Sequence, residues 1–412
     1  MPAIGTVAAM AVHDVADDPV LRYVEAGLRV GRHLDGLVDA YFGPEDLARR
    51  VDDEPRRELP ALVADLRALV ADIDAGDGDL EPVRRRWLRA QASGLHTATR
   101  KLAGEDIAYL DEVESCYGVR PEWVDHEVLA EAHRRLDAAL PGTGSDSASV
   151  AQRYDAWRTT HHIPVDKMPA VVDAVAQAFR ERTAAAFGLP EGEHVSFELV
   201  SDEPWSGFNY YLGDLQSRVA INTDLPISST AIGHLIAHEA YPGHHTEHCR
   251  KEVGLVRRRR QVEESIFLVG TPQCLLAEGL ADLAIEALLG LHHEPVMAEI
   301  LHPLGVRYDT ELVAAVGAAS EAISAVRGNA ALLVHDRRRP VDEAIAELET
   351  WGLQSHQRAT KAMAFLTHPT WRAYIFCYVA GLPLCRTFVG GDPHRFARLL
   401  AEQFVPADLA AA

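Results

Sequence analysis

Residues 238–245 read His238-Glu239-Ala240-Tyr241-Pro242-Gly243-His244-His245. A histidine followed at once by a glutamate is typical of hydrolytic zinc sites built on a helix. In the usual form a second histidine stands four residues after the first, so both imidazoles leave one helix face, and the glutamate acts as general base. Here that position is Pro242, which cannot be a ligand. The stretch therefore predicts a helix that changes its path before the second histidine.

Two histidines follow the proline, and the backbone decides which of them can reach the metal. On a straight helix His245 would return to the face of His238 but roughly 10 Å along the axis, whereas His244 would point about 120° away. Pro242 lacks an N–H and clashes with the preceding turn, while Gly243 permits unusual backbone angles. A bulge that absorbs two residues would return His244 to the ligand position. We therefore favour His244 as the second ligand and keep His245 as the alternative.

The same stretch has a simpler interpretation. The chain contains 20 histidines, so a His-Glu pair arises easily by chance. His234 and His238 are also four residues apart, and they could be a bare metal clip or two core histidines.

A second element, about 40 residues further on, strengthens the prediction of a metal site. In the apolar segment 273–285 the two charged residues are Glu278 and Asp282, four residues apart and hence on one helix face. Buried carboxylates need a partner, commonly a metal or a hydrogen-bond donor. Glu278 is the candidate third ligand. Asp282 is the candidate acceptor for the other ring N–H of a ligating histidine, which would fix its tautomer.

The C-terminal region supplies candidate tyrosines. Residues 371–381 form an apolar stretch that predicts a helix, opened by Pro369 and closed near Gly381 to Pro383. Tyr374 and Tyr378 would share one face. A tyrosine beside a hydrolytic zinc centre can donate to the oxyanion that forms during attack, and we favour Tyr378 over Tyr374 for this role. Core packing with satisfied hydroxyls is the alternative.

Composition and charge narrow the class of protein. The 412 residues are 48% hydrophobic and 25% charged, typical of a globular chain, and no stretch approaches the roughly 20 apolar residues of a membrane span. The net charge of −21 disfavours nucleic acid as a partner. The five cysteines are scattered, and residues 1–20 lack the basic start of a signal peptide, so we expect a cytoplasmic protein with reduced thiols. The oligomeric state stays open.

Apolar periodicity predicts a mainly α fold. Helices are expected at 19–43, 58–75, 82–103, 124–140 and 165–188, and alternation at 194–199 and 217–222, around the aromatic stretch 208–211, predicts a small antiparallel sheet just before the motif. The motif helix is expected to begin near Ser229 or Thr230. Residues 141–145 are the best linker, which divides the chain into an N-terminal helical region, 1–145, and a catalytic-like region, 146–412, within one continuous globular unit.

The chain resembles the bacterial proteins grouped as domain of unknown function 885, whose hallmark is H-E-x-x-P-G-H-H. The resemblance covers about residues 200–385. It rests on five segments: 238–245; Val219-Ala220-Ile221-Asn222-Thr223; Ala277-Glu278-Gly279-Leu280-Ala281, with Leu280 where the family has tryptophan; 332–336 through 343–345; and Tyr378-Val379-Ala380-Gly381. That family is similar in fold to the mostly helical gluzincin metallopeptidases. The resemblance implies His238, His244 and Glu278 as zinc ligands and Glu239 as base.

These expectations combine into a hypothesis of a Zn²⁺-dependent peptidase acting on a peptide or small amide substrate, in which Glu239 takes a proton from the attacking water. A strand at 218–223 could pair with an extended peptide, and Arg372 or Arg386 could receive a substrate carboxylate. Two alternatives remain: a helical binding or scaffold protein with a structural or vestigial metal, and the same chemistry on a non-peptide amide or ester.

Overall fold

The computed structural model describes residues 18–76, 80–142, 149–203 and 205–411. The helices are α1 (Pro19–Gly31), α2 (Glu45–Asp53), α3 (Leu59–Ala75), α4 (Pro82–Leu102), α5 (Tyr109–Tyr117), α6 (His126–Ala139), α7 (Val150–Thr160), α8 (Met168–Ala186), α9 (Ser229–Glu239), α10 (His244–Lys251), α11 (Pro272–Leu289), α12 (Glu294–Leu301), α13 (Thr310–Ser320), α14 (Val326–His335), α15 (Val341–Thr350), α16 (His356–Leu366), α17 (Ile375–Val389), α18 (Pro393–Leu399) and α19 (Pro406–Ala410). The strands are β1 (Val38–Tyr41), β2 (His194–Val200), β3 (Gly207–Gly213), β4 (Gln216–Asn222) and β5 (Ile266–Leu268).

The predicted fold class is confirmed: the chain is mainly α with a small sheet just before the motif helix. The sheet has the order β2-β4-β3, with β3 and β4 antiparallel and β2 and β4 parallel. A two-residue turn at Asp214 and Leu215, both at positive φ, folds β4 back between its neighbours. Strand β3 runs opposite to β2, and the hairpin reverses the chain again. Strand β4 therefore runs in the same direction as β2 and pairs with it in parallel. A second sheet pairs β1 with β5, antiparallel.

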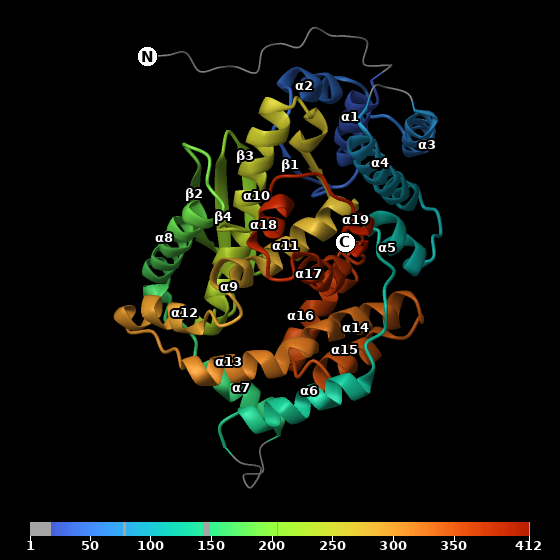
Figure 1. The fold of residues 1–412 in the computed structure, drawn as a ribbon. Coiled ribbons are helices and arrows are strands. Elements are labelled where there is room, and N and C mark those ends of the chain that lie inside the picture. The colour runs from blue at the N-terminus through green and yellow to red at the C-terminus, as the bar shows by residue number, and fades with distance from the viewer. Residues whose placement is uncertain (1–17, 77–79, 143–148, 204, 412) are drawn as a thin grey trace.

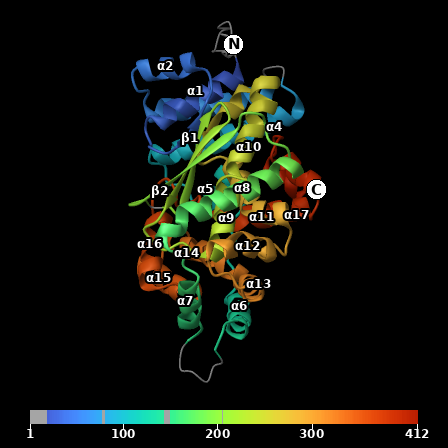
Figure 2. The ribbon, with the colours of Figure 1, turned by 90° about the vertical axis from the view of Figure 1, so that its left-hand side faces the viewer.

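The helices α9, α11 and α17 lie in the middle of the molecule, between α1 to α4 at one end and α6, α7 and α13 at the other (Figures 1 and 2). Two hydrophobic clusters hold these parts together. The short strand β5 lies between the clusters, because Ile266 and Leu268 belong to the smaller one and Phe267 to the larger one. This alternation is the period of two that a strand imposes on its side chains.

Most predicted helices are found, and two boundaries are wrong. The segments 58–75, 82–103, 124–140 and 165–188 correspond to α3, α4, α6 and α8. The helix expected over 19–43 ends at Gly31, and β1 follows it. The chain turns back closely there, since a Cβ on Gly31 would lie 2.6 Å from the Val38 Cγ2. The helix expected at 371–381 begins at Ile375 and continues through Gly381 and Pro383 to Val389.

The division of the chain at 145 stays a prediction. The linker at 141–145 lies partly outside the described residues, which stop at 142 and resume at 149. Side chains from α5 and α6 join the larger hydrophobic cluster together with those of α8, α9 and α11. In the described part of the chain, no helix is long and apolar enough to cross a membrane.

Candidate metal centre

Helix α9 carries the first half of the motif. Ser228, one residue before the positions expected from the sequence, caps this helix by accepting a hydrogen bond from the Thr230 N–H. Ile232 and Ile236 are fully buried, and they fix the helix against the core. His238 and Glu239 occupy its last two positions, and both are buried. The sequence predicts one distorted helix through 245, whereas the structure has two helices, and α10 begins at His244.

The break between α9 and α10 is a tight reversal around Gly243. The Gly243 N–H donates to the Ala237 carbonyl at 2.8 Å, and the Tyr241–Pro242 peptide bond is cis. A Cβ on Gly243 would lie 1.9 Å from the His238 carbonyl oxygen, so only glycine fits. Glycine is therefore required for a close backbone approach rather than for an unusual φ. The reversal brings His244 back toward His238, which is the outcome expected from the bulge.

His244, rather than His245, faces the other candidate ligands. The Nε2 atoms of His238 and His244 are 3.1 Å apart. The Glu278 carboxylate lies 3.2 Å from the His238 Nε2 and 3.8 Å from the His244 Nε2. One ligand atom from each of these three residues can be chosen so that all lie within 4.8 Å of one another. The structure thus brings together the three residues predicted as ligands.

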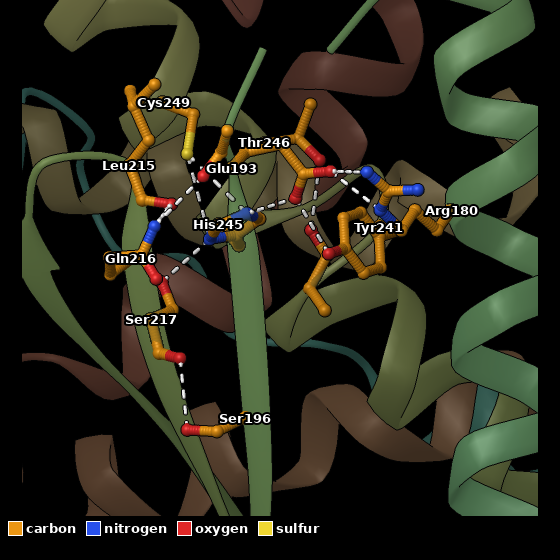
Figure 3. Close-up of polar contacts among 12 residues, drawn as sticks. Arg180, Glu193, Ser196, Leu215, Gln216, Ser217, Tyr241, His245, Thr246 and Cys249 are labelled. Carbon is orange, nitrogen blue, oxygen red and sulfur yellow. Dashed lines mark hydrogen bonds and ion pairs between the residues drawn. The ribbon is translucent and has the colours of Figure 1, made fainter. Parts of the chain in front are cut away.

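His245 points into a separate buried network (Figure 3). Its Nδ1 lies 2.8 Å from the Ser217 hydroxyl, and its Nε2 lies 2.9 Å from the Glu193 carboxylate. The Tyr241 hydroxyl donates to the same carboxylate, which also pairs with Arg180. His245 and Glu193 are completely inaccessible to solvent. This network fixes the first turn of α10 against β4, so His245 supports the reversal and takes no place beside His238.

The acidic residues of α11 take the places predicted for them. The Asp282 carboxylate lies 3.0 Å from the His238 Nδ1, on the side opposite the Nε2. The Tyr374 hydroxyl donates to the Glu278 Oε1 at 2.6 Å. The buried Glu278 Oε2 has one polar neighbour among the described residues, the His238 Nε2 at 3.2 Å. A carboxylate oxygen and an imidazole nitrogen that face each other in a buried site can both be ligands of one cation.

The spacing of the donor atoms suits zinc. Zinc lies about 2.0–2.1 Å from nitrogen ligands and at similar distances from carboxylate oxygens, so tetrahedral ligand atoms stand about 3.4 Å apart. The observed distances lie around that value: 3.1 Å between the two Nε2 atoms, 3.2 Å from the His238 Nε2 to the Glu278 Oε2, and 3.8 Å from the His244 Nε2 to the Glu278 Oε1. With the His238 Nδ1–H donated to Asp282, the His238 Nε2 keeps its lone pair, and the His244 Nε2 beside it can also present one, so both can bind one cation. The donor set of two histidines and one glutamate fits a zinc ion.

A second group of possible ligands shares His238. His234, His238 and Asp282 also bring one ligand atom each within 4.8 Å. The side chain of His234 is 48% exposed, whereas that of Glu278 is 6% exposed. A metal at this second group would therefore have His234, an exposed side chain, as one of its ligands. The Asp282 carboxylate already lies close to the rings of both His234 and His238. The buried group with Glu278 is the better candidate centre.

The electrostatics of the centre favour a cation. Burial lowers the pKa of His238, but hydrogen bonds with Asp282 and Glu278 outweigh burial and raise the pKa well above its usual value. Burial raises the pKa of Glu278, yet the hydrogen bond with His238 and the charge of His244 hold it below the ordinary value. The carboxylates around His238 thus favour positive charge there, and a divalent cation bound at this place would displace the proton of the ring.

Glu239 and Tyr378 face a cavity of about 100 Å³ that the three candidate ligands also line. Burial, supported by the Glu278 charge, raises the pKa of Glu239, which suits a group that must accept a proton and release it. Burial and three nearby carboxylates raise the pKa of Tyr378 well above 10, so its phenol stays protonated and can donate. The Tyr378 hydroxyl makes no hydrogen bond in the described part of the chain, whereas that of Tyr374 is bound to Glu278.

Other expectations for substrate contacts are wrong. The segment 218–223 forms most of β4, which lies between β2 and β3, so both its edges are occupied. Strands β2 and β3 are the edge strands, and Gly207, Phe208 and Asn209 of β3 line the cavity. Arg372 is paired with Glu112, and Arg386 is paired with Glu286 and Glu321, so neither arginine is available to a substrate carboxylate.

Sequence reasoning missed three residues beside the motif. The Asn209 side-chain amide donates to the Glu239 carbonyl at 2.6 Å and fixes the end of α9. Arg327 on α14 forms no ion pair in the described part of the chain, and it lies near enough to Tyr378 and Asp282 for their charges to act on its pKa. Its neighbour Gly328 packs against Val379, next to Tyr378. Asp39 lines the cavity from β1, far from the motif in sequence. Of these three residues, only Asn209 could have been recognised from the sequence, because it lies within the strand β3.

Comparisons with known proteins give no name for this arrangement. No family model matches the chain, and no curated protein matches it. Among solved structures, the chain is similar to the crystal structure of a candidate lipoprotein from Colwellia psychrerythraea, with a TM-score of 0.49 and 14% identity. The match covers 89% of this chain and 60% of that chain, so this chain spans less than two thirds of its length. The resemblance to domain of unknown function 885 stays a prediction.

Proposed function

We propose that the protein is a zinc-dependent hydrolase, and that it is a peptidase. The observation that carries the proposal is the convergence of His238, His244 and Glu278 on the cavity that Glu239 also lines. A zinc ion held by these three residues would polarise a substrate carbonyl and lower the pKa of water to about 7.

The chain's own residues have distinct tasks in this proposal. Glu239 accepts the proton of the attacking water and passes it to the leaving amine. The neutral phenol of Tyr378 donates a hydrogen bond to the oxygen on which negative charge develops. Asp282 holds the His238 ring through its Nδ1, and Tyr374 holds Glu278. The free edge of β3 can pair with an extended peptide beside Glu239.

The proposal also covers the cellular location of the enzyme and the partners that it excludes. All five cysteines are buried free thiols, which supports a cytoplasmic location. The high negative charge argues against nucleic acid as a partner. A purely structural metal would explain the buried ligands. It would not explain a carboxylate with a raised pKa and an unbound phenol, Glu239 and Tyr378, in the same cavity.

The proposal is tested by digesting a peptide library with zinc-loaded protein, with and without chelator. We expect cleavage that the chelator abolishes and zinc restores. Glu239→Gln should remove cleavage but retain bound zinc, whereas Glu127→Gln, at an exposed position of α6, should behave as the wild type. Cleavage of ester or non-peptide amide substrates alone would assign the same chemistry to another substrate class. Undiminished cleavage by Glu239→Gln would refute the general-base role.

A further inference from the structure

Asp39 enters the cavity because of an irregularity in β1. Val38 pairs with Leu268 and Ala40 pairs with Phe267, so two residues of β1 lie opposite one of β5, and Asp39 is the extra one. Such a β-bulge turns a side chain away from the regular alternation. Ala40 packs in the larger hydrophobic cluster and Val38 against the smaller one. Asp39 instead lines the cavity that Glu239 and Glu278 also line.

This carboxylate has no partner in the described residues. It makes no hydrogen bond and no ion pair. The charges that act on its pKa are those of the Glu278 and Glu239 carboxylates, which have the same sign. Water-poor surroundings and two like charges make an unpaired carboxylate costly, and proteins keep such groups mainly where a ligand completes them. None of the chemistry assigned to Glu239, Tyr378 and the three ligands uses Asp39.

The rest of the cavity wall indicates what kind of group would complete Asp39. Aromatic side chains line the same space: Trp205, Phe208, Phe267, Phe365, Trp371 and Tyr374. Aromatic faces attract cations and also accept apolar side chains. A substrate carboxylate would be repelled by Asp39, Glu239 and Glu278 together. The cavity thus suits a primary ammonium group attached to an apolar residue.

We propose that Asp39 binds the free α-ammonium group of the substrate, so that the protein removes residues from the N-terminus of peptides. This inference rests on the proposed hydrolase function and deepens it. The ammonium group would dock on Asp39 at one end of the cavity, and the first peptide bond would lie between Glu239 and the three candidate ligands. The first side chain would contact the aromatic wall. Acetylation of the α-amine would remove its positive charge and with it the attraction to the Asp39 carboxylate.

The test compares two peptides that begin with phenylalanine and end in an amide, one with a free amine and one N-acetylated. Zinc-loaded wild type should cleave the free-amine peptide with a kcat/KM at least roughly tenfold higher, in line with a charge-assisted contact. Asp39→Asn should lose that preference by slowing only the free-amine peptide. Asp35→Asn, at an exposed position shortly before β1, is the matched control and should keep the preference. Equal rates for both peptides in the wild type would overturn the assignment.

A binding measurement separates this inference from the proposed function. Calorimetry of zinc-loaded protein with phenylalanine hydroxamate and its N-acetyl form needs no turnover. Tighter binding of the free amine, lost in Asp39→Asn, would support the ammonium site even if no peptide were cleaved. Equal binding of both forms would overturn it. Cleavage of an N-acetylated peptide that begins with lysine, dependent on Asp39, would assign the site to a side-chain amine and overturn the α-ammonium assignment. Cleavage only next to a free C-terminus would also overturn it and would point to Arg327.

Discussion

Gly279 on α11 and Gly381 on α17 lie back to back where the two helices cross. A Cβ on Gly279 would lie 2.4 Å from the Gly381 carbonyl oxygen, and a Cβ on Gly381 would lie 3.0 Å from the Gly279 Cα. The contact is backbone against backbone. It places Glu278, the neighbour of Gly279, within hydrogen-bond reach of Tyr374 and beside the cavity that Tyr378 lines. Glycine at both positions therefore connects helix packing to the geometry of the candidate centre.

Gly279→Ala should separate the two helices and move Glu278. Backbone atoms cannot yield as side chains do, so we expect a loss of about 2–3 kcal/mol in the free energy of unfolding. Zinc affinity should fall as well. Urea denaturation and zinc titration measure the two effects. Gly317→Ala is the control, because its Cβ would meet nothing within 4 Å on α13, and alanine there should stabilise by up to about 1 kcal/mol. Similar stabilities for the two variants would contradict the packing argument.

Tyr374, just before α17, and Tyr378, on α17, should give different defects when each loses its hydroxyl. Tyr378→Phe should retain zinc and lower kcat by about 10²-fold, because its hydroxyl is unbound and faces the reacting groups. Tyr374→Phe should weaken zinc binding, since its hydroxyl holds the Glu278 Oε1. Steady-state kinetics and zinc titration of both variants separate these roles. A large kcat defect in Tyr374→Phe with unchanged zinc affinity would exchange the assignments.

Asp282→Asn should weaken zinc binding without removing a ligand. The carboxylate fixes the His238 ring through Nδ1 at 3.0 Å, and loss of such a partner typically lowers metal affinity about 10–100-fold. Competition with a chelating dye measures that change. Asp173→Asn, exposed on α8, should bind zinc as the wild type does. His234→Gln should also leave the affinity unchanged. A strong loss in His234→Gln would instead favour the group formed by His234, His238 and Asp282.

The stability of the zinc-free protein should fall with rising pH on account of Asp39. Burial and the charges of Glu278 and Glu239 raise the pKa of Asp39 from 3.8 to about 7. Between these values the folded protein keeps a proton that the unfolded chain has lost, so the contribution of Asp39 to stability is lost as pH rises through about 7. Asp39→Asn should therefore stabilise more at pH 8 than at pH 5, by about 1–2 kcal/mol. Chelator-treated protein unfolded in urea at both pH values gives the comparison, with Asp35→Asn as control. The same gain at both pH values would contradict the raised pKa.

The fold class and the candidate ligands follow from patterns that act over short distances. Helical periodicity identified α3, α4, α6 and α8, alternation identified β2 and β4, and the aromatic stretch 208–211 marked β3 between them. Glu278 and Asp282 were recognisable because two charges in an apolar helix must face something polar. His244 could be preferred because proline and glycine between it and His238 had to redirect the backbone.

The missed features depend on contacts that are distant in sequence. Gly381 was interpreted as a helix end, whereas the backbone of α11 packs against it and α17 continues. Asp39 reaches the cavity because β1 pairs with β5, more than 200 residues further on, and the bulge in that pairing has no local signal. His245 looked like a possible ligand because its partners Glu193 and Ser217 come from other elements.

The central claim, that His238, His244 and Glu278 hold one zinc ion, is tested most directly by a crystal structure of zinc-loaded protein with anomalous data at the zinc edge. We predict one strong peak about 2.0–2.2 Å from the Nε2 atoms of both histidines and from the Glu278 carboxylate. A peak between His234, the His238 Nδ1 and Asp282, or no peak in protein soaked with zinc, would contradict the account.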